Sequence, residues 1–181
     1  MKSKHWLLYA LITTFFWGVW GAFIGLPTSN GFPETLGYCV WALTMIPPAI
    51  IALRHIKWDL QYDKKSKIYG CIIGFTGAGG QLVLFHAVTT GPVYLIFPII
   101  SLSPVITIAL SFLLLKERST RIGGVGIILA LIAIPLFDYA DNESGTDYGV
   151  LWFIYALIVM AAWGIQAFFI KLSNETMHAE S

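Results

Sequence analysis

Charged residues are scarce in this sequence. Only 12% of its 181 residues are Asp, Glu, Lys or Arg, whereas 57% are hydrophobic, and the mean hydropathy is +0.74. A soluble domain carries about 25% charged residues, so this chain has too few charges to cover a surface that faces water. The composition therefore indicates a membrane protein.

The sequence also lacks the residue groups on which most enzymes and pumps depend. It contains no paired carboxylates, no His and Cys cluster suited to a metal, and no nucleophile beside a base. No P-loop is present, which excludes a nucleotide-driven pump on this chain. Cys39 and Cys71 lie near opposite ends of neighbouring apolar runs, so we expect them not to pair. We expect no catalytic residue, no metal and no cofactor.

Long apolar runs dominate the chain instead. A helix that crosses a bilayer needs about 20 apolar residues, and six runs reach or approach this length. The sequence predicts an all-α membrane protein, a polytopic helical bundle with transmembrane helices at residues 6–26, 35–53, 68–90, 93–115, 122–137 and 150–170. We expect the lipid bilayer to be its main partner and the cell membrane, most simply the bacterial cytoplasmic membrane, to be its location.

The basic residues predict the orientation of these spans. They gather in four places: Lys2 and Lys4; Arg54, Lys57, Lys64, Lys65 and Lys67; Lys116, Arg118 and Arg121; and Lys171. With six spans, all four places fall on one side of the membrane, which the positive-inside rule assigns to the cytoplasm. Both termini are then cytoplasmic, and residues 27–34 and 138–149 face outside. Basic loops beside spans are more often topology signals than nucleic-acid sites, so we expect no nucleic-acid partner.

One apolar stretch occurs twice. Residues 6–26 and 152–172 are identical at ten of 21 positions, among them Trp17 with Trp163 and Gly18 with Gly164. Five spans separate the two starts, so the second copy crosses the membrane in the opposite direction. Inverted repeats of this kind are typical of transporters, in which two halves enclose a site near the middle of the bilayer. We assign Gly18 and Gly164 a structural role.

Three features together resemble the EamA-type transporters of the drug/metabolite transporter superfamily. They are the Trp-Gly pair in the first span, the inverted repeat, and a proline-containing fourth span that ends in Glu117 and precedes a Gly-rich fifth span. The resemblance implies ten helices arranged as an inverted 5+5 repeat. Against that pattern the chain holds a first five-helix repeat at 6–137, an acidic extracytoplasmic linker at 138–149 and the start of a second repeat at 150–181. We therefore expect a fragment that self-associates or lacks a C-terminal half.

Polar residues inside apolar spans mark candidate sites, because burying them in lipid is costly. His86, near the outer end of its span, is either a proton-linked or substrate-contacting group or an imidazole bonded to a backbone carbonyl, and we favour the second interpretation. Gln81 lies near the middle of the same span, where an amide needs partners or a wet cavity. Trp17 and Trp163 lie at mid-span, where they can stack on rings or cations or fill a helix contact.

The fourth span has prolines on both sides of two serines. Pro98 and Pro104 each remove a main-chain donor near Ser101 and Ser103, so the span is either kinked or a discontinuous helix that lines a site. We expect the first, third and fourth spans to converge on a cavity whose substrate-binding residues are Trp17, Gln81, His86, Ser101, Ser103 and Trp163. Glu117 is expected to be structural, paired with Arg118, Arg121 or a helix end.

These observations favour a secondary transporter that moves a small metabolite or drug-like solute across the membrane by alternating access. An alternative is a non-transporting scaffold or assembly protein that retains the transporter fold. A membrane enzyme is disfavoured because the catalytic residue groups are missing. The sequence does not identify the solute or the direction of its movement.

Overall fold

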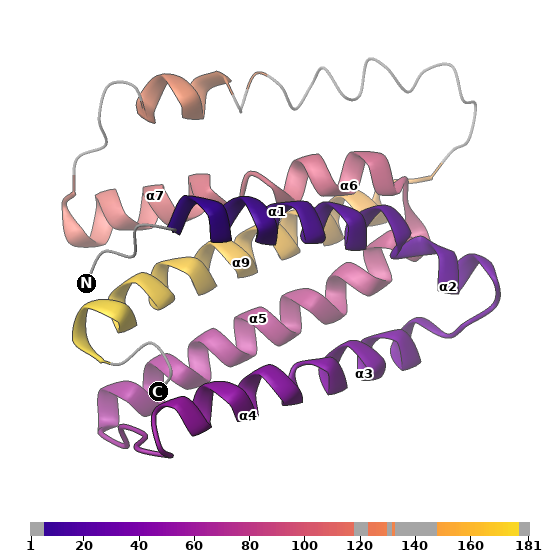
Figure 1. The fold of residues 1–181 in the computed structure, drawn as a ribbon. Coiled ribbons are helices and arrows are strands. Elements are labelled where there is room, and N and C mark those ends of the chain that lie inside the picture. Colours follow the sequence, from indigo (N-terminus) through magenta and orange to yellow (C-terminus); the bar gives the residue numbers. More distant parts are fainter. Residues whose placement is uncertain (1–5, 118–122, 130–131, 133–147, 178–181) are drawn as a thin grey trace.

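The computed structural model describes residues 6–117, 123–129, 132 and 148–177. Its regular structure in these residues is helical, and residues 123–129 form a helical segment as well. The other helices are α1 (Trp6–Phe23), α2 (Gly25–Ser29), α3 (Glu34–Thr44), α4 (Ile46–His55), α5 (Lys64–Thr90), α6 (Val93–Ile100), α7 (Ser103–Leu115) and α9 (Leu151–Thr176) (Figure 1).

Within the described residues, five helical segments are long and apolar enough to cross a membrane. They are Leu7–Ser29, Glu34–His55, Lys64–Thr90, Val93–Leu115 and Leu151–Thr176. The expectation of an all-α, polytopic membrane protein is confirmed. Half of the expected span at 122–137 lies outside the described residues.

Three of these segments are built from two helices each. The α3–α4 break falls at Met45, directly before Pro47 and Pro48 in the first turn of α4. The α6–α7 break falls at Ser101 and Leu102, and Pro104 again lies in the first turn of the following helix. Proline fits the first turn of a helix because the missing N–H has no intrahelical partner there. The breaks thus lie where the sequence removes main-chain donors.

Helix α5 begins earlier than hydropathy predicts, at Lys64 rather than near residue 68. Asp63 caps it, since its carboxylate accepts hydrogen bonds from the main-chain N–H of Lys65 at 3.0 Å and of Ser66 at 3.4 Å. The Ser66 hydroxyl also donates to this carboxylate, and these bonds, the hydroxyl bond first, lower the pKa of Asp63. A local cap, rather than an apolar residue, therefore determines where the helix begins.

Helix α9 is the centre of the bundle. It packs along α5 over most of its length and also contacts α6 and α7 (Figure 1). The most deeply buried large side chains come from these helices, namely Leu84, Ile96, Val159 and Phe168. Helix α1 runs in the opposite direction to α9 and meets it at Trp163.

The segments that carry the described basic residues lie at one end of the bundle. Figure 1 places the α4–α5 connection, the end of α7 and the end of α9 at the same end, and α1 begins there. This arrangement agrees with the grouping of Lys and Arg on one side. The side of the membrane that this end faces stays a prediction.

Candidate functional site

A large cavity lies between α1, α3, α5, α6, α7 and α9. Its volume is about 1520 Å³, which is ample for a small organic solute. Five of the six expected site residues line it: Trp17, Gln81, Ser101, Ser103 and Trp163. The sixth, His86, does not. Whether the five bind a substrate stays a prediction.

Aromatic rings form much of the cavity wall. Trp17 and Trp163, the matched tryptophans of the repeat, lie with ring centroids 5.2 Å apart. On α3, the rings of Tyr38 and Trp41 stack with centroids 5.8 Å apart. The Trp17 side chain is half exposed, at 50%, so its ring is accessible from the cavity. The face of an aromatic ring is electron-rich, so rings that line a cavity are suited to contact with a cation.

Glycines on α5 let the side chains of α9 approach the same wall. A Cβ atom at Gly80 would lie 2.7 Å from Trp163 Nε1, and one at Gly77 would lie 2.4 Å from Gln166 Nε2. Both distances are far below ordinary contact, so a larger residue at either position would displace the facing side chain. Gly77 and Gly80 therefore determine where Gln166 and Trp163 lie.

Gln81 is the most deeply buried polar residue of the wall. It is 3% exposed, and its Nε2 atom has no hydrogen-bond partner among the described residues. An unsatisfied buried donor costs about 1–3 kcal/mol. Gln81 thus has an unused hydrogen-bond donor beside the cavity.

The α6–α7 break brings both serines of the fourth span to the cavity. Ser101 and Leu102 join the two helices, and the Ser101 hydroxyl donates to the carbonyl of Pro98 at 2.6 Å. Pro98 lies inside α6, whereas Pro104 begins α7. The span is therefore divided between the two prolines.

The two matched glycines have different surroundings. A Cβ atom at Gly164 would lie 2.4 Å from Ile106 Cβ and 2.8 Å from the carbonyl oxygen of Ser103, both on α7. The Gly164 carbonyl also accepts a hydrogen bond from Thr107 Oγ1 at 2.9 Å. Gly18 has no such neighbour within 4 Å in the part of the chain that the structure describes. Close helix contact accounts for Gly164 but not for Gly18.

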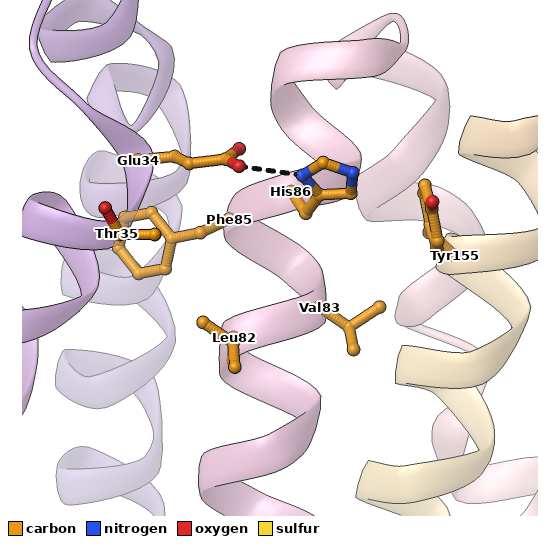
Figure 2. Close-up of a pocket in the computed structure, with 7 residues that line it drawn as sticks. All are labelled: Glu34, Thr35, Leu82, Val83, Phe85, His86 and Tyr155. Carbon is orange, nitrogen blue, oxygen red and sulfur yellow. Dashed lines mark hydrogen bonds and ion pairs between the residues drawn. The ribbon is translucent and has the colours of Figure 1, made fainter.

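His86 lies in a separate pocket of about 250 Å³ between α3, α5 and α9. Figure 2 shows its ring between Glu34 and Tyr155. Its Nδ1 atom lies 2.8 Å from Glu34 Oε1, and Thr89 Oγ1 donates to Glu34 Oε2 at 2.9 Å. The expected bond to a backbone carbonyl is wrong, because a carboxylate 52 residues away in sequence is the partner.

Glu117 also has a different partner from those expected. Its carboxylate forms an ion pair with Lys171 of α9. Arg118 and Arg121 lie outside the described residues. The pair joins the end of α7 to α9, so a structural role for Glu117 agrees with the geometry.

Four residues of these sites were not expected from the sequence. Glu34 was overlooked because it precedes the apolar run at 35–53 by one residue. Tyr38 and Trp41 carry no signal of their own, because aromatic side chains are common in membrane spans. Gln166 did carry a signal, since it is a polar residue inside an apolar span.

The cavity wall is uncharged. Among its described lining residues there is no Asp, Glu, Lys, Arg, His or Cys. In the part of the chain that the structure describes, no three His, Cys, Asp or Glu side chains gather where they could hold a metal ion. The cavity offers rings, hydroxyls and amides for binding.

Comparison with known proteins agrees with this architecture. The EamA-like transporter family matches residues 4–137. The uncharacterized protein MJ1333.1 of Methanocaldococcus jannaschii is 30% identical over 135 residues, which cover 75% of this chain and 97% of that protein. Protein LicB of Haemophilus influenzae is 24% identical over an alignment that covers 94% of this chain and 64% of LicB. No solved structure matches. The chain belongs to the EamA-like transporter family.

Proposed function

We propose that the protein acts in secondary transport and binds a small organic solute in the cavity between Trp17 and Trp163. The observation that carries the proposal is the meeting of the two matched tryptophans at this cavity, 5.2 Å apart, in a member of a transporter family. In an inverted repeat, matched residues meet near the axis that relates the two copies, and transporter sites lie there. Movement of the helices about this axis would expose the solute to each side of the membrane in turn.

The lining favours an organic cation without N–H groups. Ring faces attract cations, and quaternary ammonium groups are bound in this way in other proteins. A primary ammonium would leave its N–H donors without a carboxylate, and an anion would find no basic side chain among the described lining residues. A quaternary cation needs neither a carboxylate to accept N–H donors nor a basic side chain. The proposal assigns no chemical conversion to the cavity and places the protein in the cytoplasmic membrane.

Binding and uptake of 1,1-dimethylpiperidinium test this proposal. The purified protein should bind this cation, and vesicles that contain the protein should accumulate it faster than empty vesicles. Trp17→Ala should weaken binding about tenfold, as loss of a desolvated cation–π contact of roughly 1–2 kcal/mol predicts.

The matched control is Trp58→Ala, because Trp58 is exposed and does not line the cavity. It should bind the cation like the unaltered protein. Equal binding by the Trp17 and Trp58 variants would place the site elsewhere. Binding without uptake would favour the scaffold alternative.

A further inference from the structure

Two glutamine amides stand on adjacent helices at one wall of the cavity. Gly77 and Gln81 are four residues apart on α5 and so lie on the same face, one turn from each other. Gln166 of α9 lies against Gly77, with its Nε2 atom 2.4 Å from the position of a Cβ there. The Gln166 amide is therefore about one helical turn from Gln81.

The repeat differs between its copies at this point. When the two copies are aligned so that Trp17 matches Trp163, Gln166 matches Trp20. The Trp20 ring packs edge-on against Phe85 and Phe97, with centroids 6.3 Å away in each case. One copy thus supplies an indole to the core, whereas the other supplies an amide to the cavity.

Three of the hydroxyl donors in the wall, those of Thr13, Thr14 and Ser101, are already used. Thr13 donates to the carbonyl of Tyr9 and Thr14 to that of Ala10, each at 2.9 Å, and Ser101 donates to Pro98. The Nε2 atom of Gln81, by contrast, is buried without a partner among the described residues. The terminal torsion of glutamine is soft, so this amide can turn toward a solute at small cost.

We propose that Gln81 and Gln166 bind an uncharged acceptor oxygen of the solute, and that Gly77 positions Gln166 for this contact. The inference rests on the proposed function, since it describes the polar end of the same solute. An ether, hydroxyl or carbonyl oxygen accepts hydrogen bonds from the amides without bringing a negative charge into a wall that has no described basic residue. The solute is then an organic cation that carries one such oxygen.

A pair of cations with the same shape and charge tests the oxygen contact. 4,4-Dimethylmorpholinium has an ether oxygen where 1,1-dimethylpiperidinium has a methylene. Calorimetry on the purified protein should give about fivefold tighter binding of the morpholinium, as one net hydrogen bond predicts. Gln166→Leu should remove this preference, because leucine has no donor for the oxygen.

Variants of α5 test the positioning role of Gly77. Gly77→Ala places a methyl group where the Gln166 amide lies, so it should also remove the preference. Gly79→Ala is the matched control on the same helix, because a Cβ at Gly79 has no neighbour within 4 Å among the described residues and Gly79 does not line the cavity. In a Gln166→Leu background, Gly77→Ala should cause no further loss of the preference. If Gly77→Ala lowers the preference further in that background, Gly77 does not act by positioning Gln166.

The outcomes separate the two proposals. If neither cation binds, the proposed function fails and this inference fails with it. If both bind equally well to the unaltered protein, or if the preference survives Gln166→Leu, only the inference is overturned. Should Gly77→Ala fail to fold, the Gln166→Leu result alone decides whether the amide binds the oxygen.

Discussion

Replacing Gly164 by alanine should destabilise the protein, whereas the same change at Gly18 should not. The two glycines are matched in the repeat and both lie inside long helices. At Gly164 the new methyl carbon would lie 2.4 Å from Ile106 Cβ and 2.8 Å from the carbonyl oxygen of Ser103. At Gly18 it would meet no such atom of the described residues within 4 Å.

The magnitude follows from the difference between the two sites. Favourable carbon–carbon contact needs about 3.5–4.0 Å, so α7 and α9 must separate by about an ångström to admit the methyl group that Gly164→Ala adds. The main-chain oxygen of Ser103 cannot swing away as the end of a flexible side chain can. Overpacking of this kind costs about 1–3 kcal/mol. The gain in helix propensity from glycine to alanine is common to both variants, so it cancels in their comparison.

The assay is unfolding of the purified protein in mixed micelles by increasing amounts of a denaturing detergent. Gly164→Ala should unfold at a lower detergent fraction than Gly18→Ala, with a difference in unfolding free energy of about 1–3 kcal/mol. If the two variants are equally stable, the contact between α9 and α7 is not as close as the structure places it. The reasoning would then be refuted.

Three further outcomes are expected. Glu117→Gln and Lys171→Met should each reduce stability by less than about 1 kcal/mol, because the pair is partly exposed, and a double-mutant cycle should give a coupling that salt weakens. Asp63→Ala should destabilise α5 at neutral pH. Hydrogen bonds lower the pKa of Asp63, so its contribution exists above the unfolded pKa and is lost as pH falls through the folded value, and stability curves of the two proteins should converge in acid. In intact cells without native cysteines, a membrane-impermeant thiol reagent should label a cysteine at position 141 but not one at Asp59; the reverse would overturn the predicted orientation.

The helices could be predicted from the sequence because long apolar runs have few other stable states in a bilayer. The ends of the helices were less predictable, since hydropathy does not identify the polar side chains that cap a helix. The start of α5 at Lys64 depends on the carboxylate of Asp63, and a search for apolar residues alone misses it. The break near Pro104 could be expected because proline removes a main-chain donor.

The depth of the site residues could also be predicted, because each residue adds a fixed rise along its helix. Depth does not determine the direction of a side chain around the helix. Gln81 was placed toward a cavity by the cost of an unpaired amide in lipid, and the same reasoning applies to Gln166. Gln166 was not predicted, because it is not one of the positions at which the two copies agree.

Pairs of polar residues far apart in sequence were not predictable in this way. Glu34 and His86 are separated by 52 residues, and Glu117 and Lys171 by 54. His86, Glu117 and Lys171 were each visible as a polar group near the end of a span, whereas Glu34 was not. The partner of each residue depends on which helices pack together, and no pattern within one helix reports that choice.

The departures from symmetry in the repeat bear most directly on how the cavity could orient a solute. A cavity built only from matched residues would present equivalent walls, and equivalent walls cannot distinguish the two ends of a solute. The matched tryptophans supply such walls on both sides. Gln166, which replaces the indole of Trp20, makes one side polar, and it can do so because Gly77 leaves room for it. If the cavity binds a solute as proposed, residues that differ between the copies, rather than those they share, would orient it.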